Sequence, residues 1–195
     1  MNRQQQKENT RRKLLDTALD VFSRNGITAT RMSDIAEAAG VSHGTVFLHF
    51  ESQEVLISAV IEDFGFRMAS RTHELSRESG SVKEILAAHL RGIQEHESFY
   101  SRLVKESSHL PIVARIALTD IQSAVSFHIS RAAEREMAAG TIKRMPVALL
   151  FNTWVGLIHY YLSNADQFAP GESVIESCGS MLLEHFMRMI SIENQ

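Results

Sequence analysis

The chain has 195 residues and a single cysteine, Cys178; 44% of its residues are hydrophobic, 22% are charged, and the formal net charge is −3. This composition predicts a globular core and excludes an intrachain disulfide, which fits a reducing compartment. No apolar run approaches the roughly 20 residues needed to cross a bilayer, and the N-terminus lacks the apolar centre of a signal peptide. We therefore expect a cytoplasmic protein without a membrane partner.

Apolar residues recur at helical spacing up to Phe22, and Asn25-Gly26 ends that run. The pattern predicts a first helix over residues 10–25. For residues 1–9, a flexible arm that enters a minor groove and a solvated tail are equal alternatives. The start of the chain is strongly basic although the rest is mildly acidic, and its basic residues are Arg3, Lys7, Arg11, Arg12 and Lys13.

Two short helices, over residues 32–39 and 43–50, are predicted to flank a tight turn at Gly40. Ser42 can cap the second helix, because its hydroxyl oxygen can accept a hydrogen bond from a free N–H group of the first turn. This arrangement is typical of a helix-turn-helix, whose second helix enters the major groove of DNA. The residues that would meet base edges are His43, Gly44 and Thr45.

The rest of the sequence predicts further helices and no strands in the C-terminal half. A fourth helix, over residues 53–78, would connect two domains. A capping box (Ser81-x-x-Glu84) and three prolines bound the later helices, which are expected at about residues 81–96, 112–139, 146–164 and 172–191. The predicted fold is all-α, with a three-helix DNA-binding domain at residues 1–52 and a helical bundle at residues 53–195.

The segment from Thr10 to about Ile61 resembles the DNA-binding domain of the TetR (tetracycline repressor) family of transcriptional regulators. The residues that carry the resemblance are Gly26, Thr30, Ile35-Ala36, Ala39-Gly40-Val41-Ser42, Gly44 and His49-Phe50-x-Ser52-x-Glu54. The resemblance covers about a quarter of the chain. The C-terminal bundle is predicted to bind an effector and to dimerise, and the resemblance also implies the dimer.

Nine residues are predicted to contact DNA. Thr30 is expected to cap the next helix at a phosphate-binding N-terminus, and Arg31 could reach a phosphate directly. Phe47 and Gln53 stand where the family usually has tyrosine and lysine, so we expect an altered grip that Arg31 and the basic arm offset. His49 matches a family position that meets the DNA backbone. The full set is Thr30, Arg31, Ser42, His43, Gly44, Thr45, Phe47, His49 and Gln53.

Aromatic and imidazole side chains in the C-terminal part could line an apolar effector pocket, and core packing is the alternative for each of them. These residues are Phe99, Tyr100, Phe127, His128, Trp154, His159 and Tyr160. The two most apolar segments, at residues 146–164 and 172–191, are expected to form a homodimer surface, as the resemblance also implies. Its expected residues are Gly156, Ile158, Tyr161, Gly179, Met181 and Leu182.

The preferred interpretation is a ligand-responsive repressor that binds a palindromic operator as a homodimer and is released by a small, largely apolar organic effector. The alternative is an architectural or adaptor DNA-binding protein without an effector. We expect no enzyme, since no nucleophile, metal or phosphate motif accompanies His128, His159 and Tyr160. We expect no cofactor and no metal, since Glu106-x-x-His109 is the only Glu-x-x-His in the sequence.

Overall fold

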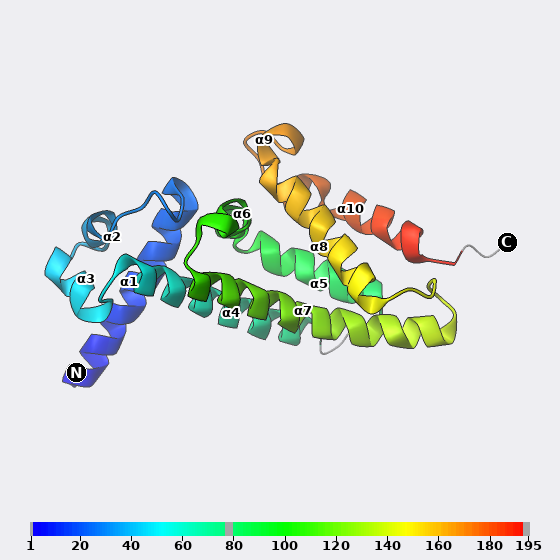
Figure 1. Ribbon diagram of the computed structural model, residues 1–195, viewed down its shortest axis with the longest axis horizontal. Helices are drawn as coiled ribbons and strands as arrows, with labels where there is room; N and C mark the ends of the chain where they lie inside the picture. Colours follow the sequence, from blue (N-terminus) through cyan, green and yellow to red (C-terminus); the bar gives the residue numbers. More distant parts are fainter. Residues whose placement is uncertain (1, 77–79, 193–195) are drawn as a thin grey trace. The chain divides into compact units, whose positions relative to one another are not determined.

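The computed structural model describes residues 2–76 and 80–192 (Figure 1). These residues form helices, short loops and one isolated antiparallel bridge between Ile142 and Ser191. The prediction of an all-α fold is confirmed. Among the described helices, none combines the length and the hydrophobicity that crossing a membrane requires.

The described residues divide into two compact units. The first combines the chain up to Phe66 with Ser98–Asp120, and the second combines Arg67–Glu97 with the chain from Ile121 onward. The predicted division after residue 52 therefore differs from these units. A segment distant in sequence packs with the N-terminal helices, and spacing along the chain does not reveal such a contact.

The helices in chain order are α1 (Arg3–Asn25), α2 (Met32–Ala39), α3 (His43–His49), α4 (Gln53–Ser76), α5 (Val82–Gln94), α6 (Glu97–Glu106), the 3-10 helix η1 (Ser107–His109), α7 (Ile112–Ala139), α8 (Val147–Ser163), α9 (Ala165–Phe168) and α10 (Val174–Ile190). Most predicted helix limits agree with these to within two residues. The predicted end of the fourth helix at residue 78 lies outside the described residues. The differences lie at α1, α6 and the short α9.

Helix α1 begins at Arg3, seven residues before the predicted start, so residues 3–9 are helical and do not form an extended arm. The Asn2 side chain caps this helix by accepting a hydrogen bond from Gln4 N at 3.4 Å. The segment that follows is made of glutamine, lysine and glutamate, which are good helix formers. Thr10 lies inside the helix, where its hydroxyl donates to the carbonyl of Gln6 at 2.9 Å.

The core of the first unit forms where α1 packs on the two short helices that follow it. Six residues of α1 are buried: Leu14, Leu15, Ala18, Leu19, Val21 and Phe22. Helix α2 contributes Met32, Ile35, Ala36 and Ala39 to this core, and α3 contributes Val46. This packing holds α2 and α3 as one rigid group on α1.

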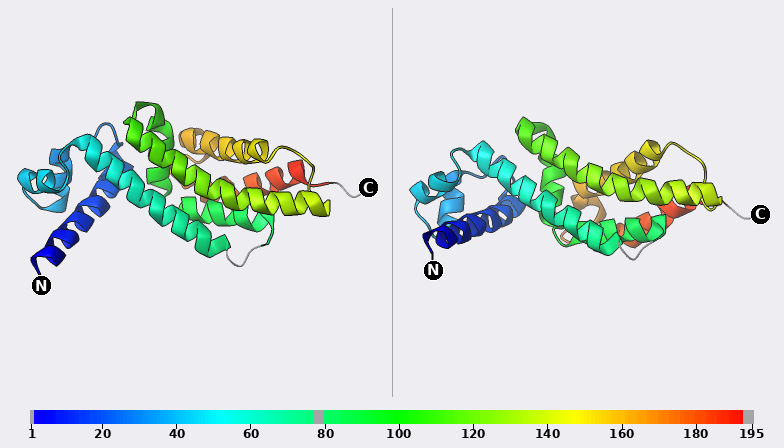
Figure 2. Two further views of the ribbon diagram at one scale, coloured as in Figure 1. Left: turned by 60° about the horizontal axis from the view of Figure 1, so that its bottom comes forward. Right: turned by 90° about the horizontal axis from the view of Figure 1, so that it is seen from below.

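The core of the second unit forms where α10 packs on α5 and α8 (Figure 2). Gly179 of α10 faces α5: a Cβ there would lie at ordinary contact distance from Leu90 Cδ1, 3.6 Å, and 3.3 Å from Ile175 Cγ2 of its own helix. Trp154 of α8 is fully buried and packs beside Phe186 of α10, with ring centroids 5.2 Å apart.

Two carboxylates in the second unit satisfy the free N–H groups of helices that lie far away in the sequence. Glu97 accepts hydrogen bonds from Val174 N at 2.7 Å and Ile175 N at 3.1 Å, at the start of α10. Glu136 of α7 accepts from Val82 N at 2.6 Å, at the start of α5. Negatively charged hydrogen-bond acceptors stabilise helix N-termini, so these contacts fix where α5 and α10 begin.

Candidate nucleic-acid interface

The turn between α2 and α3 has the predicted geometry. Gly40 adopts the left-handed conformation with φ +64°, and Val41 N donates to the carbonyl of Ala36 at 3.0 Å. The Ser42 hydroxyl accepts a hydrogen bond from Thr45 N at 3.2 Å and therefore caps α3, as expected. The two helices of a helix-turn-helix are thus joined by satisfied backbone groups.

Helix α3 buries one face and exposes the other. Val46 is fully buried, and Phe50 just after the helix is also buried. The exposed side carries His43, Gly44 and Phe47, whose ring is 44% exposed and lies edge-on to the His43 ring with centroids 4.8 Å apart. Polar and aromatic groups at the first turn of an exposed helix can meet base edges in a major groove.

Gly44 is exposed within the first turn of α3, and no internal contact explains why it is a glycine. A Cβ built there would have one neighbour within 4 Å, Ser42 Oγ at 3.8 Å, which is ordinary contact. Glycine in a helix costs roughly 1 kcal/mol relative to alanine. No contact among the described residues therefore requires a glycine at this position.

Thr30 and Gln53 use their polar groups inside the protein, contrary to the prediction. The cap of α2 is Arg31, whose N–H donates to Asp34 Oδ2 at 2.8 Å. Thr30 is 1% exposed, and its hydroxyl donates to the carbonyl of Gly26 at 2.6 Å. Gln53 Nε2 donates to the carbonyl of Thr30 at 2.8 Å. A local contact with Gly26 therefore engages the Thr30 hydroxyl, and a tertiary contact between α4 and Thr30 engages the Gln53 amide.

A row of basic residues on α1 lies on the same side as the end of α3. Arg3, Lys7 and Arg11 are four residues apart, which places them on one face of the helix. The Arg11 guanidinium lies 4.9 Å above the centre of the Phe50 ring. Burial, and then the charges of Lys7 and Arg11, lower the pKa of His49. These cations thus extend the exposed surface of α3 along α1.

Arg12, in contrast, is paired with acidic residues. Its guanidinium forms ion pairs with Asp16 at 3.2 Å and with Asp63 at 2.7 Å. The latter contact joins α1 to α4, so Arg12 serves the packing of these helices.

Residues 14–60 match the model of the family described as bacterial regulatory proteins, tetR family. A match over a longer span is the Escherichia coli K12 protein named "Probable acrEF/envCD operon repressor", which is 26% identical over 134 residues. These matches indicate a regulator of the TetR family. The alignment covers 69% of this chain and 54% of that relative, so the chain spans about half the relative's length.

Solved structures agree with the TetR fold over nearly the whole chain. A TetR-family transcriptional regulator from Agrobacterium tumefaciens has a TM-score of 0.78 at 14% identity, covering 95% of this chain and all of that one. FadR from Bacillus subtilis, solved with stearoyl-CoA, has a TM-score of 0.74 at 19% identity, covering 90% of this chain and 96% of that one. The matching relatives are named as regulators and repressors of transcription, not as enzymes.

The predicted effector residues divide between the two units. Phe99 and Tyr100 lie in the first, and both are buried beside Phe64, with ring centroids 5.0 and 6.2 Å from it. Burial raises the pKa of the Tyr100 phenol. Core packing accounts for the positions of both rings.

The other predicted effector residues lie in the second unit. Trp154 Nε1 donates to Nδ1 of His89, a buried residue that the sequence did not single out, at 3.0 Å. Burial lowers the pKa of His89 to about 4, with a contribution from His159, and burial also lowers the pKa of His159 to about 4. Phe127 and Tyr160 are 58% and 57% exposed, so the second unit does not enclose them. His128 is half-buried beside Phe127, with ring centroids 5.6 Å apart.

Half of the predicted dimer residues belong to the core of the second unit. Ile158, Gly179 and Leu182 are buried there, which corrects the prediction, because the inner faces of α8 and α10 pack within the chain. Gly156 and Met181 are exposed. Tyr161, half-buried, stacks on Phe168 with ring centroids 4.1 Å apart.

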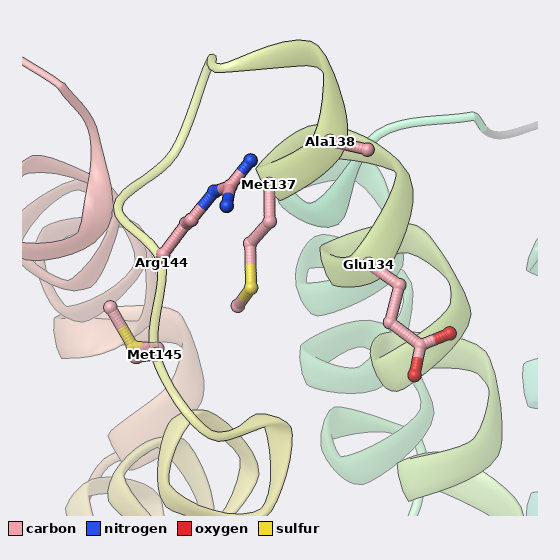
Figure 3. Close-up of a pocket in the computed structure, with 5 residues that line it drawn as sticks. All are labelled: Glu134, Met137, Ala138, Arg144 and Met145. Atoms are coloured by element: carbon pink, nitrogen blue, oxygen red, sulfur yellow. The ribbon is translucent and has the colours of Figure 1, made fainter.

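The second unit has two surface pockets among its described residues, and none of the predicted effector residues lines either of them. One, of about 550 Å³, lies between the end of α7 and the loop before α8, where Met137 and Arg144 extend toward each other (Figure 3). The other, of about 440 Å³, has both acidic and basic residues at its edge, Glu184, Lys83 and Arg188. Both are open to solvent.

Proposed function

We propose that this TetR-family protein is a transcriptional repressor that binds a palindromic operator as a homodimer and is released by a small, largely apolar organic effector. The observation that carries the DNA-binding part is the first turn of α3. That turn is exposed, is capped by Ser42, and contains a glycine that no contact among the described residues requires. The helix is held from behind by buried Val46 and Phe50, so its outer face can enter a groove as a rigid body.

Selection of bound sequences from random duplex DNA by the purified protein tests this part. We expect an enriched palindrome whose half-site centres lie about one helical turn apart or slightly more. Enrichment of no sequence would refute sequence-specific DNA binding. Enrichment of a single unpaired half-site would refute binding as a symmetric dimer.

We assign the contacts with DNA phosphates to basic side chains that lie outside the core. Arg31 is exposed at the start of α2, and Arg3, Lys7 and Arg11 form the row on α1. They offset the missing phosphate contacts of Phe47, which has no hydroxyl, and of Gln53, whose amide is bound to Thr30.

The salt dependence of operator affinity tests this assignment, because each neutralised phosphate contributes about −0.9 to the slope of log K against log salt concentration. Both Arg31→Ala and Lys7→Gln are expected to flatten the slope by about 1. Arg12→Gln is the control, since its ion pairs with Asp16 and Asp63 withdraw it from DNA. Unchanged slopes in the first two variants would reject the assignment.

The dimer is proposed to form through the outer faces of α8 and α10. Helix α8 contains no Asp, Glu, Lys or Arg, and its exposed residues are Ala148, Leu149, Asn152, Thr153, Gly156 and Tyr160. On α10, Met181 is 53% exposed and follows the small, exposed residues Ser177 and Ser180. The uncharged outer face of α8, with its small residues, favours close packing of helices, as in a two-fold interface.

Gly156→Gln tests the dimer, because no atom lies within 4 Å of a Cβ at this position and the protomer should keep its fold. We expect the wild-type protein to sediment as a dimer and the variant to dissociate at least tenfold more readily. Glu134→Gln, an exposed change on α7, is the control. A monomeric wild-type protein would refute the interface.

The effector part rests on relatives and on the apolar side chains of the C-terminal helices. FadR from Bacillus subtilis was solved with stearoyl-CoA, and another neighbour is the ketosteroid transcriptional regulator KstR2 of Mycobacterium tuberculosis. The stearoyl chain and the steroid skeleton that these names contain are both apolar. In this chain, buried Trp154 with His89 and His159 offers apolar surface with a few polar groups, which is typical of a small-molecule site.

Stearoyl-CoA and a ketosteroid serve as probes for this part. We expect one of these classes to raise the thermal midpoint of the free protein and to weaken operator binding by roughly 5- to 150-fold, which corresponds to a coupling free energy of about 1 to 3 kcal/mol. By linkage, operator DNA must weaken binding of the same ligand by the same factor. If neither probe binds, the result would favour an architectural or adaptor protein that has no effector.

A further inference from the structure

The turn between α1 and α2 is held by a carboxylate that lies 78 residues further along the chain. Glu106, the last residue of α6, accepts hydrogen bonds from Ile27 N at 3.2 Å, from Thr28 N at 2.8 Å and from the Thr28 hydroxyl at 2.7 Å. All these residues belong to the first compact unit, and Figure 1 shows α6 beside this turn. One side chain therefore satisfies three donors of a loop that could otherwise reorient.

Further contacts hold the same turn from both ends. Arg102, one helical turn before Glu106 on α6, donates through Nη2 to the carbonyl of Arg24 at 3.2 Å. At the other end, Gln53 Nε2 binds the carbonyl of Thr30 at 2.8 Å. Gly26 admits the carboxylate, because a Cβ there would lie 2.9 Å from Glu106 Oε1, and its φ of +95° also favours glycine.

We propose that Glu106 is a positioning residue for DNA binding: its carboxylate fixes the turn between α1 and α2 and thereby sets the orientation of α2 and α3 for the major groove. This inference rests on the proposed operator binding. The turn leads directly into Arg31 and Asp34 at the start of α2. Since α2 and α3 pack as one group, a change in the angle of α2 moves the exposed first turn of α3 with it.

The negative charge of Glu106 allows a positioning role to be distinguished from a direct effect of charge on DNA binding. Glu106 is acidic, so it cannot hold a phosphate, and removing its charge should leave non-specific DNA binding unchanged or slightly stronger. If Glu106 positions the reading helix, the same change must weaken specific binding. A direct charge effect and a positioning effect therefore have opposite signs for operator DNA.

The test uses the full chain, the operator selected with the wild-type protein, and a scrambled duplex of equal length. For Glu106→Gln we expect about a tenfold loss of operator affinity, an unchanged salt slope, and unchanged or slightly tighter binding to the scrambled duplex. Glu62→Gln is the matched control, because it removes one exposed carboxylate from α4 in the same unit. It should leave the ratio of the two affinities unchanged.

Hydrogen exchange separates positioning from unfolding. In Glu106→Gln, the amides of Ile27 and Thr28 should exchange faster, while the amide of buried Val46 on α3 stays protected. Thr28→Val removes only the hydroxyl contact and should cause a smaller loss of operator affinity in the same direction.

The outcomes distinguish this inference from the proposed function. A wild-type protein that enriches no DNA sequence refutes the proposed function. A wild-type protein that binds its operator, with Glu106→Gln binding it equally well, refutes only the role of Glu106. An equal loss of affinity for operator and scrambled duplex, or loss of protection at Val46, would mean general destabilisation and would also overturn the role.

Discussion

Gly44 is the residue at which the requirements of folding and of binding separate most clearly. The chain around it leaves room for a methyl group, and a Cβ would meet only Ser42 Oγ at 3.8 Å. We predict that Gly44→Ala keeps or raises the free energy of unfolding by up to about 1 kcal/mol, because alanine is the better helix former. The same variant should lose at least tenfold in operator affinity, because the methyl group would separate α3 from the floor of the groove.

Thermal unfolding and fluorescence anisotropy with the selected operator measure these two effects on one preparation. Their opposite directions are the diagnostic feature. If Gly44→Ala binds the operator as well as the wild-type protein does, the proposal that α3 approaches the DNA closely at this residue is wrong. If it unfolds more easily, the glycine has a conformational role that the structure does not explain.

His89 makes stability depend on pH. Burial lowers its pKa from 6.5 to about 4, while its Nδ1 accepts the Trp154 N–H. Because the folded-state pKa lies below the unfolded value, the unfolded chain binds the proton first as the pH falls. The stabilisation is complete above about pH 6.5 and is lost progressively as the pH falls toward 4, with a total on the order of 3 kcal/mol.

His89→Gln should reduce this acid sensitivity, since an amide oxygen can still accept from Trp154 but does not titrate. Urea unfolding at pH 7, 6 and 5 should show a stability difference between pH 7 and 5 that is smaller than in the wild-type protein by roughly 1–2 kcal/mol. His185→Gln, an exposed change on α10, is the control and should retain the wild-type dependence. Equal slopes in all three proteins would contradict the assignment to His89.

At the scale of elements, α10 depends on an anchor outside itself. Glu97 accepts hydrogen bonds from Ser173, Val174 and Ile175, so it binds the free donors at the helix N-terminus. We predict that Glu97→Ala lowers the free energy of unfolding by about 1–3 kcal/mol, because partly buried donors lose a charged acceptor. Glu184→Gln, which removes an exposed carboxylate from the middle of α10, should change it by less than about 0.5 kcal/mol.

Differential scanning calorimetry at neutral pH measures both variants. An effect of Glu97→Ala no larger than that of Glu184→Gln would mean that water replaces the carboxylate at no cost.

The elements also separate what local sequence can and cannot predict. The limits of α2 and α3 follow from Gly40 and Ser42, whose effects reach only a few residues along the chain. Helix α6 was not predicted, although Phe99, Tyr100 and Leu103 have the spacing of one buried helical face. The start of α1 was placed too late, at residue 10, whereas Thr10 lies within the helix.

For the dimer as a whole, the two copies of α3 must bind half-sites on the same face of one DNA duplex if the proposed interface is correct. Inserting about 5 base pairs between the half-sites turns one of them to the opposite face of the DNA, since a helical turn takes about 10 base pairs. We predict that this insertion reduces affinity to that of a single half-site, a loss of roughly 100-fold or more.

Gel mobility with the original, the 5-base-pair and a 10-base-pair insertion distinguishes the possibilities. The 10-base-pair insertion keeps the phase but changes the separation, so it should recover affinity only in part. Equal affinity for all three duplexes would show that the half-sites are bound independently, and it would exclude a rigid two-fold dimer.

The all-α class, the helix-turn-helix and the resemblance to the TetR family could be predicted from the sequence, because they depend on periodicity, on turn residues and on motifs that lie within some fifty neighbouring positions. The folded structure was needed to show which polar groups are available. It engages the Thr30 hydroxyl and the Gln53 amide in hydrogen bonds within the chain, buries Ile158, Gly179 and Leu182 in the core, and brings Glu106 to the turn before α2. The physical reason is that burial and hydrogen-bond partners are set by contacts between segments many residues apart, which residue type and spacing alone do not encode.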